Sequence, residues 1–419
     1  MIKTANRKMK DSGIDWIGEI PEDWICSRVK YYVDCYDGQR IPIDSGSRKD
    51  GPYPYWGAGS ITDYIDRYLF DEELVLLGED GAPFFDKTRD VSFLIDEKVW
   101  INNHIHVLKP KASVLAKYVV YYLNTVDYKI YINGSILNKL TQNNMNNISF
   151  LVPDIKIQEK IIDYLDTKCS KIDAIIEREQ TVIEKLKEYK LSVITEAVTK
   201  GLNPDVEMKD SGIEWIGEIP KNWKTPKLKY LASISSGGTP DRNHPEYWGG
   251  DINWIKTGEL QNNELFSVEE HITREGFEAS SAQMFDINTI LMAMYGQGKT
   301  RGMTALLKVP STTNQACAGI VVRSKLIKVK FLWKALIASY IPIREKANGS
   351  GQPNLSQALI GNFNIPLPSI EEQDKIVHFI NGKTPQIDAT INQKQSIIDK
   401  LTEYKKSLIY ECVTGKREV

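Results

Sequence analysis

Cysteine, histidine and long apolar runs are scarce in this chain of 419 residues. Its five cysteines are widely spaced and odd in number, which excludes a disulfide framework and leaves too few ligands for a Cys/His zinc site. They are Cys26, Cys35, Cys169, Cys317 and Cys412. We expect reduced thiols in a cytoplasmic protein. No apolar run approaches the ~18–20 residues that span a bilayer. The basic start, Met1 to Lys10, lacks the apolar segment of a secretory signal.

Charge of one sign is not in excess either. The formal net charge is −2, and 26% of residues are charged. This balance excludes a uniformly basic coat for nucleic acid, but it allows binding through local basic and polar loops, because net charge governs solubility and steering rather than one groove.

Catalytic motifs are also missing. Gly298-Lys299-Thr300 resembles the end of a phosphate-binding loop, but Ala293 stands where that loop needs its first glycine. Residues 204–209 (PDVEMK) carry the letters of a metal-dependent nuclease motif, in a connector too short to place them on adjacent strands. No Asn-Pro-Pro-aromatic run of adenine methyltransferases occurs, and no histidine triad is apparent. We therefore predict a non-catalytic chain that binds neither a metal nor a cofactor of its own.

An internal repeat is the main positive feature. Residues 9–24 (MKDSGIDWIGEIPEDW) and 208–223 (MKDSGIEWIGEIPKNW) are identical at 13 of 16 positions. A second match aligns residues 153–200 with 368–415, with 22 of 48 positions identical. The segments between them diverge almost completely. Each half therefore has a constant start, a variable middle and a constant end, which predicts two related surfaces that recognise different things. A duplicated protein whose middles simply drifted is the alternative.

The constant ends predict long paired helices, because apolar residues recur every three or four positions. The expected seam contains Ile172, Ile176, Ile183, Leu186 and Val193 in the first copy, and Ile387, Ile391, Ile398, Leu401 and Leu408 in the second. Glu179 and Lys394 occupy the same seam position, so they either meet as an ion pair or remain two solvated charges.

The helix boundaries are predicted from Thr384-Pro385, a capping hydroxyl followed by proline, which is typical of a helix start. We expect a short helix near residues 373–380, a break, and a helix of roughly 30 residues ending near Val413, with the same plan in the first copy. Two such helices packed antiparallel would form a rod of about 45 Å with a globular domain near each end, which would act as a ruler. A pseudo-two-fold repeat further requires the C-terminus to lie close to the first constant start.

The variable middles, about 25–152 and 224–367, contain short apolar runs punctuated by Gly, Pro, Asn and Asp, a pattern of strands and loops. Residues 74–77, 290–293 and 319–322 are predicted strands, and 117–124 and 330–340 are predicted helices. Each middle is therefore expected to be a mixed α/β domain.

Several loops of the middles are rich in groups that contact DNA, since Arg and Lys suit phosphate and guanine, and Asn and Gln suit adenine. In the first middle the candidates are Gln39, Arg40, Lys87, Arg89, Asn102, Asn103, His104, Asn133 and Ser135. In the second they are Thr239, Lys256, Tyr295, Gln297, Lys299, Arg301, Asn314, Gln315 and Gln352. Each residue alone is equally explained as part of an ordinary turn. Five aromatic residues, Tyr55, Trp56, Tyr247, Trp248 and Trp254, fit a core position as well as a DNA contact.

Over about 410 residues the chain resembles the specificity subunits of type I restriction-modification systems. The doubled SGI(D/E)WIGEIP start, the doubled helical end with its IDA, LxEYK and EAVT or ECVT stretches, and the divergent segments between them carry the resemblance. It implies an α+β fold of two target-recognition domains joined by an antiparallel two-helix coiled coil, as a pseudo-circular repeat. The expected boundaries are residues 1–153 and 202–368 for the recognition domains, and 154–201 and 369–419 for the helical regions.

The resemblance also implies function and partners. Each recognition domain would read one half of an asymmetric bipartite site in double-stranded DNA, and the helices would set the spacer and dock two methyltransferase subunits. S-adenosylmethionine would belong to those subunits, and ATP and Mg to a restriction subunit if one joins. Two other readings stay open: a self-sufficient restriction-methylation enzyme, which would need motifs this chain lacks, and a coiled-coil scaffold with two protein-interaction domains.

Overall fold

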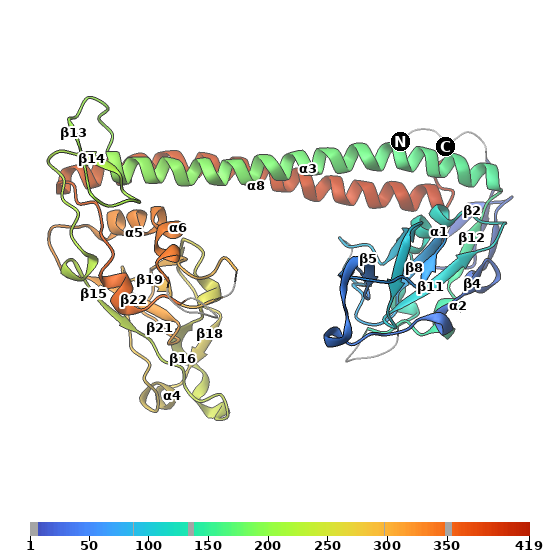
Figure 1. The fold of residues 1–419 in the computed structure, drawn as a ribbon, viewed down its shortest axis with the longest axis horizontal. Helices are drawn as coiled ribbons and strands as arrows, with labels where there is room; N and C mark the ends of the chain where they lie inside the picture. The colour runs from blue at the N-terminus through green and yellow to red at the C-terminus, as the bar shows by residue number, and fades with distance from the viewer. Residues whose placement is uncertain (1–6, 87, 133–137, 297, 348–353) are drawn as a thin grey trace. The chain divides into compact units, whose positions relative to one another are not determined.

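The computed structural model describes residues 7–86, 88–132, 138–296, 298–347 and 354–419 (Figure 1). The chain forms two compact units, one made of residues 1–180 and 394–419 (unit 1) and one of residues 181–393 (unit 2). Each unit contains one mixed α/β domain and a part of both long helices, α3 (Ile155–Lys200) and α8 (Ile370–Val413). This confirms the predicted α+β class with two mixed domains and two paired helices.

The domain of unit 1 is built on an antiparallel sheet of order β4-β11-β8-β9. A second sheet, β6-β5-β10-β7, lies beside it, and the pairs β1-β2 and β12-β3 complete the strands. Their bounds are β1 (Met9–Asp11), β2 (Glu19–Pro21), β3 (Ile25–Arg28), β4 (Val33–Cys35), β5 (Asp50–Trp56), β6 (Ile61–Ile65), β7 (Phe70–Asp71), β8 (Leu74–Gly78), β9 (Ser92–Ile95), β10 (Lys98–Ile101), β11 (Ile105–Pro110) and β12 (Ser149–Val152). Helix α1 (Ala116–Leu123) packs against β8, β9 and β11, and helix α2 (Gln142–Asn146) packs against the 3-10 turn at Val29–Tyr31.

The domain of unit 2 repeats this plan. Its main sheet has the order β15-β22-β19-β20-β17 and its second sheet the order β18-β16-β21. The bounds are β13 (Met208–Asp210), β14 (Glu218–Pro220), β15 (Ala232–Ser236), β16 (Trp248–Ile255), β17 (Asn263–Leu265), β18 (Glu270–Ile272), β19 (Ile290–Ala293), β20 (Thr304–Leu307), β21 (Thr312–Thr313) and β22 (Cys317–Val322). The helices are α4 (Arg274–Glu278), α5 (Val329–Ala338), α6 (Tyr340–Glu345) and α7 (Gln357–Gly361).

The strands and helices predicted in the variable middles are present. Strands β8, β19 and β22 cover the three predicted strands, and α1 and α5 cover the two predicted helices. Of the aromatic residues left open between core and surface, Tyr55 and Trp254 are buried in the core. Another of them, Trp248, is half-buried, and the guanidinium of Arg242 lies 3.5 Å from its ring centroid.

The predicted break in the constant helices is wrong. Helix α8 runs through Pro385 without interruption, and α3 is likewise continuous. Pro385 has no backbone N–H to donate to residue 381. Thr384 is buried within the helix, where its hydroxyl donates to the carbonyl of Ile380 at 3.0 Å instead of capping a helix start. The helices therefore have 46 and 44 residues rather than roughly 30. No helix within the described ranges is both long enough and apolar enough to cross a bilayer.

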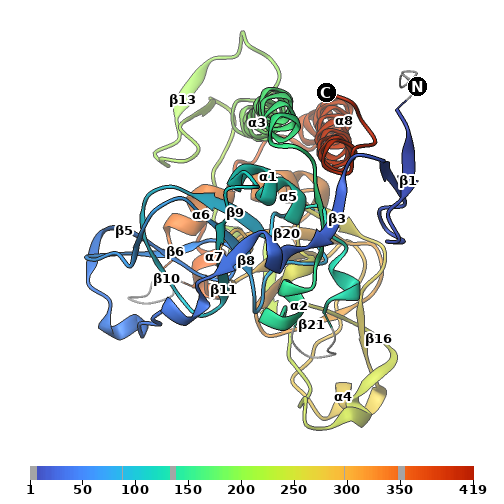
Figure 2. The same ribbon diagram turned by 90° about the vertical axis from the view of Figure 1, so that its right-hand side faces the viewer.

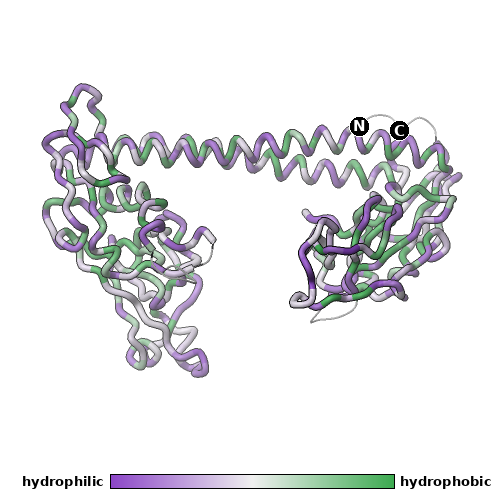
Figure 3. The backbone as a smooth tube through the Cα atoms, viewed as in Figure 1, coloured by the Kyte–Doolittle hydropathy of each residue, from purple (hydrophilic) through white to green (hydrophobic). Residues whose placement is uncertain are grey.

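The helices pack side by side and antiparallel, as the end-on view shows (Figure 2). Hydrophilic and hydrophobic residues alternate along both of them, as expected of helices that bury one face (Figure 3). The ten seam residues are all buried or half-buried: Ile172, Ile183, Ile387, Ile398 and Leu408 are buried, and Ile176, Leu186, Val193, Ile391 and Leu401 are half-buried.

Ion pairs across the helices follow the repeat. In unit 1, Lys405 of the second EYK motif contacts Asp173 of the first IDA motif at 2.7 Å. In unit 2 the copies exchange roles, and Lys190 contacts Asp388 at 2.6 Å. Glu179 and Lys394, which are equivalent residues of the two copies, meet at 2.8 Å. Such a reciprocal pattern is that of a pseudo-two-fold repeat, in which contact i–j recurs as j–i.

The constant starts cap the helix ends in the same way in both units. Gly201 follows α3 and packs against Trp223: a Cβ added to this glycine would lie 3.2 Å from the Trp223 ring. Beyond α8, the corresponding position on Gly415 lies 3.2 Å from the ring of Trp24. The hydroxyl of Tyr410 also donates to the carbonyl of Trp16 at 2.8 Å. The C-terminal end of α8 therefore lies at the first constant start, as predicted, and the chain is pseudo-circular.

Each long helix is tied to its domain by a buried glutamine. The Gln158 amide accepts a hydrogen bond from the backbone N–H of Leu115 and donates to the carbonyl oxygens of Ser113 and Pro153. Gln373, 215 positions later, makes the same three bonds to residues 328, 326 and 368. Both glutamines are fully buried. Because a buried amide is tolerated only when it is hydrogen-bonded, this bond set explains their identity in both copies.

Candidate nucleic-acid interface

Loops rich in DNA-contacting groups leave the same edge of the main sheet in both domains. In unit 1, β4 and β8 end at this edge and β11 begins there, because both strands are antiparallel to β11. In unit 2, β15 and β19 end and β22 begins at the corresponding edge. The edge of unit 1 carries the loops that contain Gln39 and Asn103, and the edge of unit 2 carries those that contain Thr239, Tyr295 and Gln315. We refer to them as the first and second reading edges.

A matching amide turn precedes β11 and β22. The Asn102 N–H donates to the carbonyl of Trp56 at 3.1 Å, and its side chain accepts from the N–H of His104 at 2.8 Å. The Asn314 N–H donates to the carbonyl of Ile255, and its side chain accepts from the N–H of Ala316, both at 3.1 Å. These asparagines therefore shape the turn.

The residue after each turn asparagine points outward. Asn103 and Gln315 are exposed, and both carry an amide that can pair with an adenine edge. The Thr239 hydroxyl contacts the Gln315 side chain, so it orients that amide. Gln39 and His104 are exposed at the first edge, and His104 lies 3.6 Å from Asp80.

The second edge also contains the loop after β19. Tyr295 and Lys299 are exposed there. Two carbonyls of this loop, those of Lys299 and Arg301, accept hydrogen bonds from the Tyr340 hydroxyl and the Arg344 guanidinium. These bonds attach the loop to helix α6.

Other predicted contacts are placed differently. Lys256 follows β16 and pairs with Glu270 at 2.9 Å and Glu269 at 3.4 Å, so its charge is compensated. Arg89 is exposed in the loop that joins β8 to β9, where it lines a cavity of about 450 Å³ together with Trp16 and Tyr410. Five candidates, Lys87, Asn133, Ser135, Gln297 and Gln352, lie outside the described residues.

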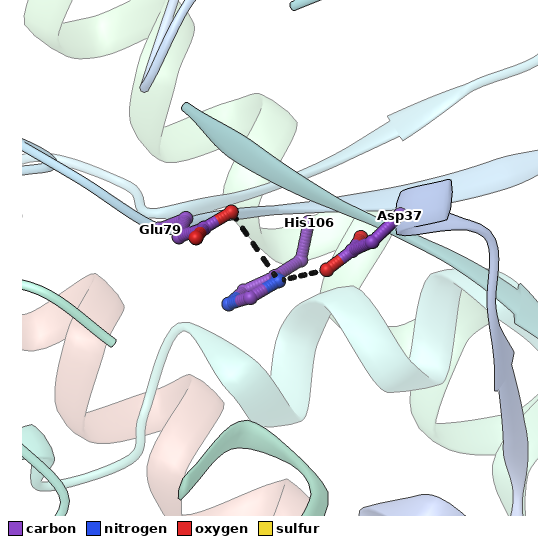
Figure 4. A group of neighbouring side chains, drawn as sticks. All are labelled: Asp37, Glu79 and His106. Atoms are coloured by element: carbon purple, nitrogen blue, oxygen red, sulfur yellow. Dashed lines mark hydrogen bonds and ion pairs between the residues drawn. The ribbon is translucent and has the colours of Figure 1, made fainter. Parts of the chain in front are cut away.

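Arg40 belongs to a buried ion cluster that we call the edge cluster, made of Asp37, Arg40, Glu79 and His106. Figure 4 shows three of its members, Asp37, Glu79 and His106. The Arg40 guanidinium contacts Glu79 at 2.6 Å and Asp37 at 3.4 Å. It also donates to the carbonyl oxygens of Asp37 and Ile105. Its side chain is 12% exposed, so its donors serve the domain rather than the surface.

His106 lies at the centre of this cluster and is fully buried. Its Nδ1 is 2.6 Å from the Asp37 carboxylate, and its Nε2 is 2.8 Å from the carbonyl of Leu140. Both partners are acceptors. Both ring nitrogens are therefore engaged within the domain.

The Asp37 carboxylate is held in its charged form. Burial alone would raise its pKa, but the hydrogen bond and charge of His106, the N–H of Val107 and the charge of Arg40 together lower that pKa below its usual value. An ionised Asp37 is consistent with its role as the acceptor for His106.

Asp37, Glu79 and His106 are close enough to suggest a metal site, since one ligand atom of each lies within 4.8 Å of the others. The arrangement does not fit a metal. The Arg40 guanidinium already lies against both carboxylates, and the two ring nitrogens of His106 lie against the Asp37 carboxylate and the Leu140 carbonyl. The cluster is an internal ion-pair network.

Sequence reasoning missed three members of this cluster, because a lone Asp, Glu or His at a strand end carries no motif. It also missed the two turn asparagines as a pair, although Asn102-Asn103 and Asn314-Gln315 both directly precede predicted or apolar strands. The signal that could have shown the two asparagines to be equivalent is their position directly before β11 and β22, which are interior strands of the two main sheets.

The comparisons with known proteins agree with this architecture. The family model described as type I restriction modification DNA specificity domain matches residues 21–187 and 220–403. The chain belongs to this family. Its two matches cover one repeat each.

Among curated relatives, the MjaVIII specificity subunit of Methanocaldococcus jannaschii is 22% identical over 96% of this chain and 94% of its own length. The MjaIX specificity subunit from the same organism is 33% identical, over 47% of this chain and 45% of its own. The EcoR124I/EcoR124II specificity subunit of Escherichia coli is 25% identical over 71% of both chains. These relatives are all named as specificity subunits of type I restriction enzymes.

A solved structure shares the fold. It was described as the structural basis of complex assembly and conformational transition of the type I R-M system, and its chain superposes with a TM-score of 0.65. The match covers 95% of this chain and 99% of the other at 12% identity, so it supports the fold alone.

Proposed function

We propose that this chain is the DNA-recognition subunit of a type I restriction-modification complex, in which each domain reads one half of an asymmetric bipartite site. The main observation in support is that the two equivalent reading edges present different side chains. Asn103 follows the turn in one domain and Gln315 in the other, and the neighbouring loops share no sequence. A common scaffold with different exposed polar groups is what two half-sites of different sequence require.

The subunit itself is non-catalytic in this proposal and acts in the cytoplasm. Two methyltransferase subunits supply S-adenosylmethionine and the methyl-transfer chemistry, and a restriction subunit, where present, supplies ATP and Mg. Support comes from the absence of catalytic motifs in the sequence and from the family, whose described role is DNA specificity.

The long helices are proposed to set the number of unread base pairs between the half-sites. Each helix continues without a break through residues of both units, so it cannot change length without displacing the segments at its ends. A rigid, continuous helix pair is the kind of element that fixes a spacing.

The experiment that tests the proposal maps methylated adenines in cells that produce the chain together with its methyltransferase partner. The expected motif is bipartite. Inserting one heptad into both α3 and α8 adds about 10 Å to each, close to three base-pair steps, so the spacer should lengthen by about three base pairs while both half-sites persist. A methylated motif in one continuous block would contradict recognition by two separate domains. An unchanged spacer would contradict the role of the helices in setting the spacing.

A coiled-coil scaffold with two protein-interaction domains is the competing function. It predicts that the assembled complex binds DNA weakly or not at all and without steep dependence on salt, whereas phosphate contacts make binding fall steeply as salt rises.

Docking of two like partners is supported by a row of surface residues kept in both copies. Lys185, Tyr189, Ser192 and Glu196 follow one face of α3, and the same four residue types occupy positions 400, 404, 407 and 411 of α8. Tyr189 is 58% exposed and Tyr404 is 51% exposed. Some exposed positions elsewhere on the helices differ between the copies, for example Arg178 and Gln393, whereas others, such as Gln180 and Gln395, are also the same. Folding does not require an identical exposed tyrosine, whereas a shared partner does, and tyrosine is a common interface hot spot.

Tyr189→Ala and Tyr404→Ala should therefore each weaken binding of one partner subunit by about 10- to 100-fold, as expected of hot-spot truncation. Native mass spectrometry should show complexes with one partner for each single variant and with neither for the double variant. The control is Arg178→Ala, an exposed position outside the row. Two partners retained by the double variant would contradict the assignment.

A further inference from the structure

The edge cluster joins four segments that form the first reading edge. Asp37 and Arg40 come from the turn after β4, Glu79 follows β8, and His106 is in β11. The fourth segment precedes α2, where Leu140 accepts from His106 and Lys139 lies 3.4 Å from Glu79. The turn that begins with Asp37 also contains Gln39, and the chain entering His106 contains Asn103 and His104.

The second domain has uncharged residues at the four corresponding positions. Strand register aligns His106 with Ala318, because His106 pairs with Leu77 of β8 and Ala318 with Met292 of β19. Glu79 aligns with Met294, since the N–H groups of these residues donate to the carbonyls of His104 and Ala316, respectively.

The alignment extends to the segment before α2 and α7. The N–H of Leu140 donates to the Glu79 carbonyl, and the N–H of Leu355 donates to the Met294 carbonyl. Counting from the paired strands, Asp37 and Arg40 correspond to Ser236 and Thr239. Ala318 and Met294 are buried. An ionic network and an apolar contact thus occupy the same place in the two domains.

We propose that Asp37, Arg40, Glu79 and His106 are positioning residues for DNA recognition by the first domain alone. The proposal rests on the proposed function. The four side chains face inward and contact no base. They set the relative positions of the loops that carry the exposed amides and the exposed histidine.

The positioning role follows from hydrogen-bond counting at His106. Its ring links the Asp37 carboxylate to the Leu140 carbonyl, which belong to different segments of the edge. Without the ring these buried acceptors lose a partner, and the segments concerned are no longer held together. The other charged groups against this ring or its partners are Arg40, Glu79 and Lys139.

The test measures half-site discrimination with the complete complex of this chain and its methyltransferase partner. Duplexes carry the mapped site with one base pair changed in either half, and dissociation constants are measured for the unmodified chain and for variants of the edge cluster. In His106→Asn, discrimination in the first half should fall about tenfold, as the loss of one buried hydrogen bond predicts, whereas discrimination in the second half should change less than about twofold.

Two variants separate positioning from simple stability. His106→Asn removes one member of the network and leaves the others buried, so it should lower discrimination in the first half. The fourfold variant Asp37→Ser, Arg40→Thr, Glu79→Met and His106→Ala installs the residues of the second domain. It should fold and recover most of the discrimination that His106→Asn loses, because replacing a whole buried ion network by uncharged groups is tolerated far better than removing one member.

The results are decisive either way. Equal losses of discrimination in both halves of the site for His106→Asn, or no recovery in the fourfold variant, would overturn the proposal. Failure of the unmodified complex to bind a specific sequence would instead refute the proposed function, which keeps the two failures distinct.

Discussion

Exchange of residues 25–152 for the corresponding segment of another family member should change one half of the methylated DNA sequence completely and leave the other half and the spacer unchanged. The physical reason is that the first reading edge lies wholly within this segment, whereas the helices and the second edge lie outside it. A change of half-site alters several base pairs at once, and each mismatched pair costs about 1–3 kcal/mol of binding. Methylation at the original site should therefore be lost entirely.

The cut points suit this exchange. Ile25 and Val152 are paired across β3 and β12, so the segment enters and leaves its domain at one place. The matched control exchanges residues 224–367, whose ends are also paired, through the bridge between Lys224 and Leu367. It should change only the other half of the motif. Methylome sequencing reads both outcomes, and a change in both halves from either exchange would show that the domains do not read independently.

The repeat made most of the architecture predictable. Two copies of one pattern require equivalent packing, so the paired helices, the mixed domains and the contact of the last helix with the first constant start followed from the sequence. The meeting of Glu179 and Lys394 remained open, because equivalence brings two residues together without showing that they pair. Pro385 was misinterpreted because a proline after threonine usually begins a helix, whereas here tertiary packing carries α8 through it.

The site was less predictable than the fold. Asn102 and Asn314 look like base-reading amides in the sequence, but both shape turns, and the exposed amides are one residue further on. Arg40 looks like a phosphate contact and is an internal ion pair. A sequence gives the type of a side chain, whereas its direction depends on partners distant in the chain, such as Glu79 for Arg40.

Gly415→Ala should destabilise the contact between the end of α8 and the first constant start by about 3 kcal/mol, whereas the equivalent Gly201→Ala should cost about 1 kcal/mol at the second start. Both glycines follow a long helix with positive φ, at 72° and 77°, so a side chain strains both backbones similarly. The two glycines differ in the room that their surroundings leave for a side chain. A Cβ on Gly415 would lie 2.4 Å from Cδ of Pro21, but on Gly201 its nearest neighbour would be 3.2 Å away.

Hydrogen exchange of the backbone amides in β1 and β2, compared with β13 and β14, measures the two contacts separately in one chain. Opening of the first pair should become about 100-fold more frequent in Gly415→Ala and about fivefold more frequent for the second pair in Gly201→Ala. Pro21→Ala should relieve the Gly415→Ala defect, because the Pro21 ring is the obstacle, and Pro220→Ala should leave Gly201→Ala unchanged. Equal effects at the two glycines would mean that backbone strain alone governs these joints, and that the closure of the repeat at the chain ends does not depend on the close packing of Gly415 against Pro21.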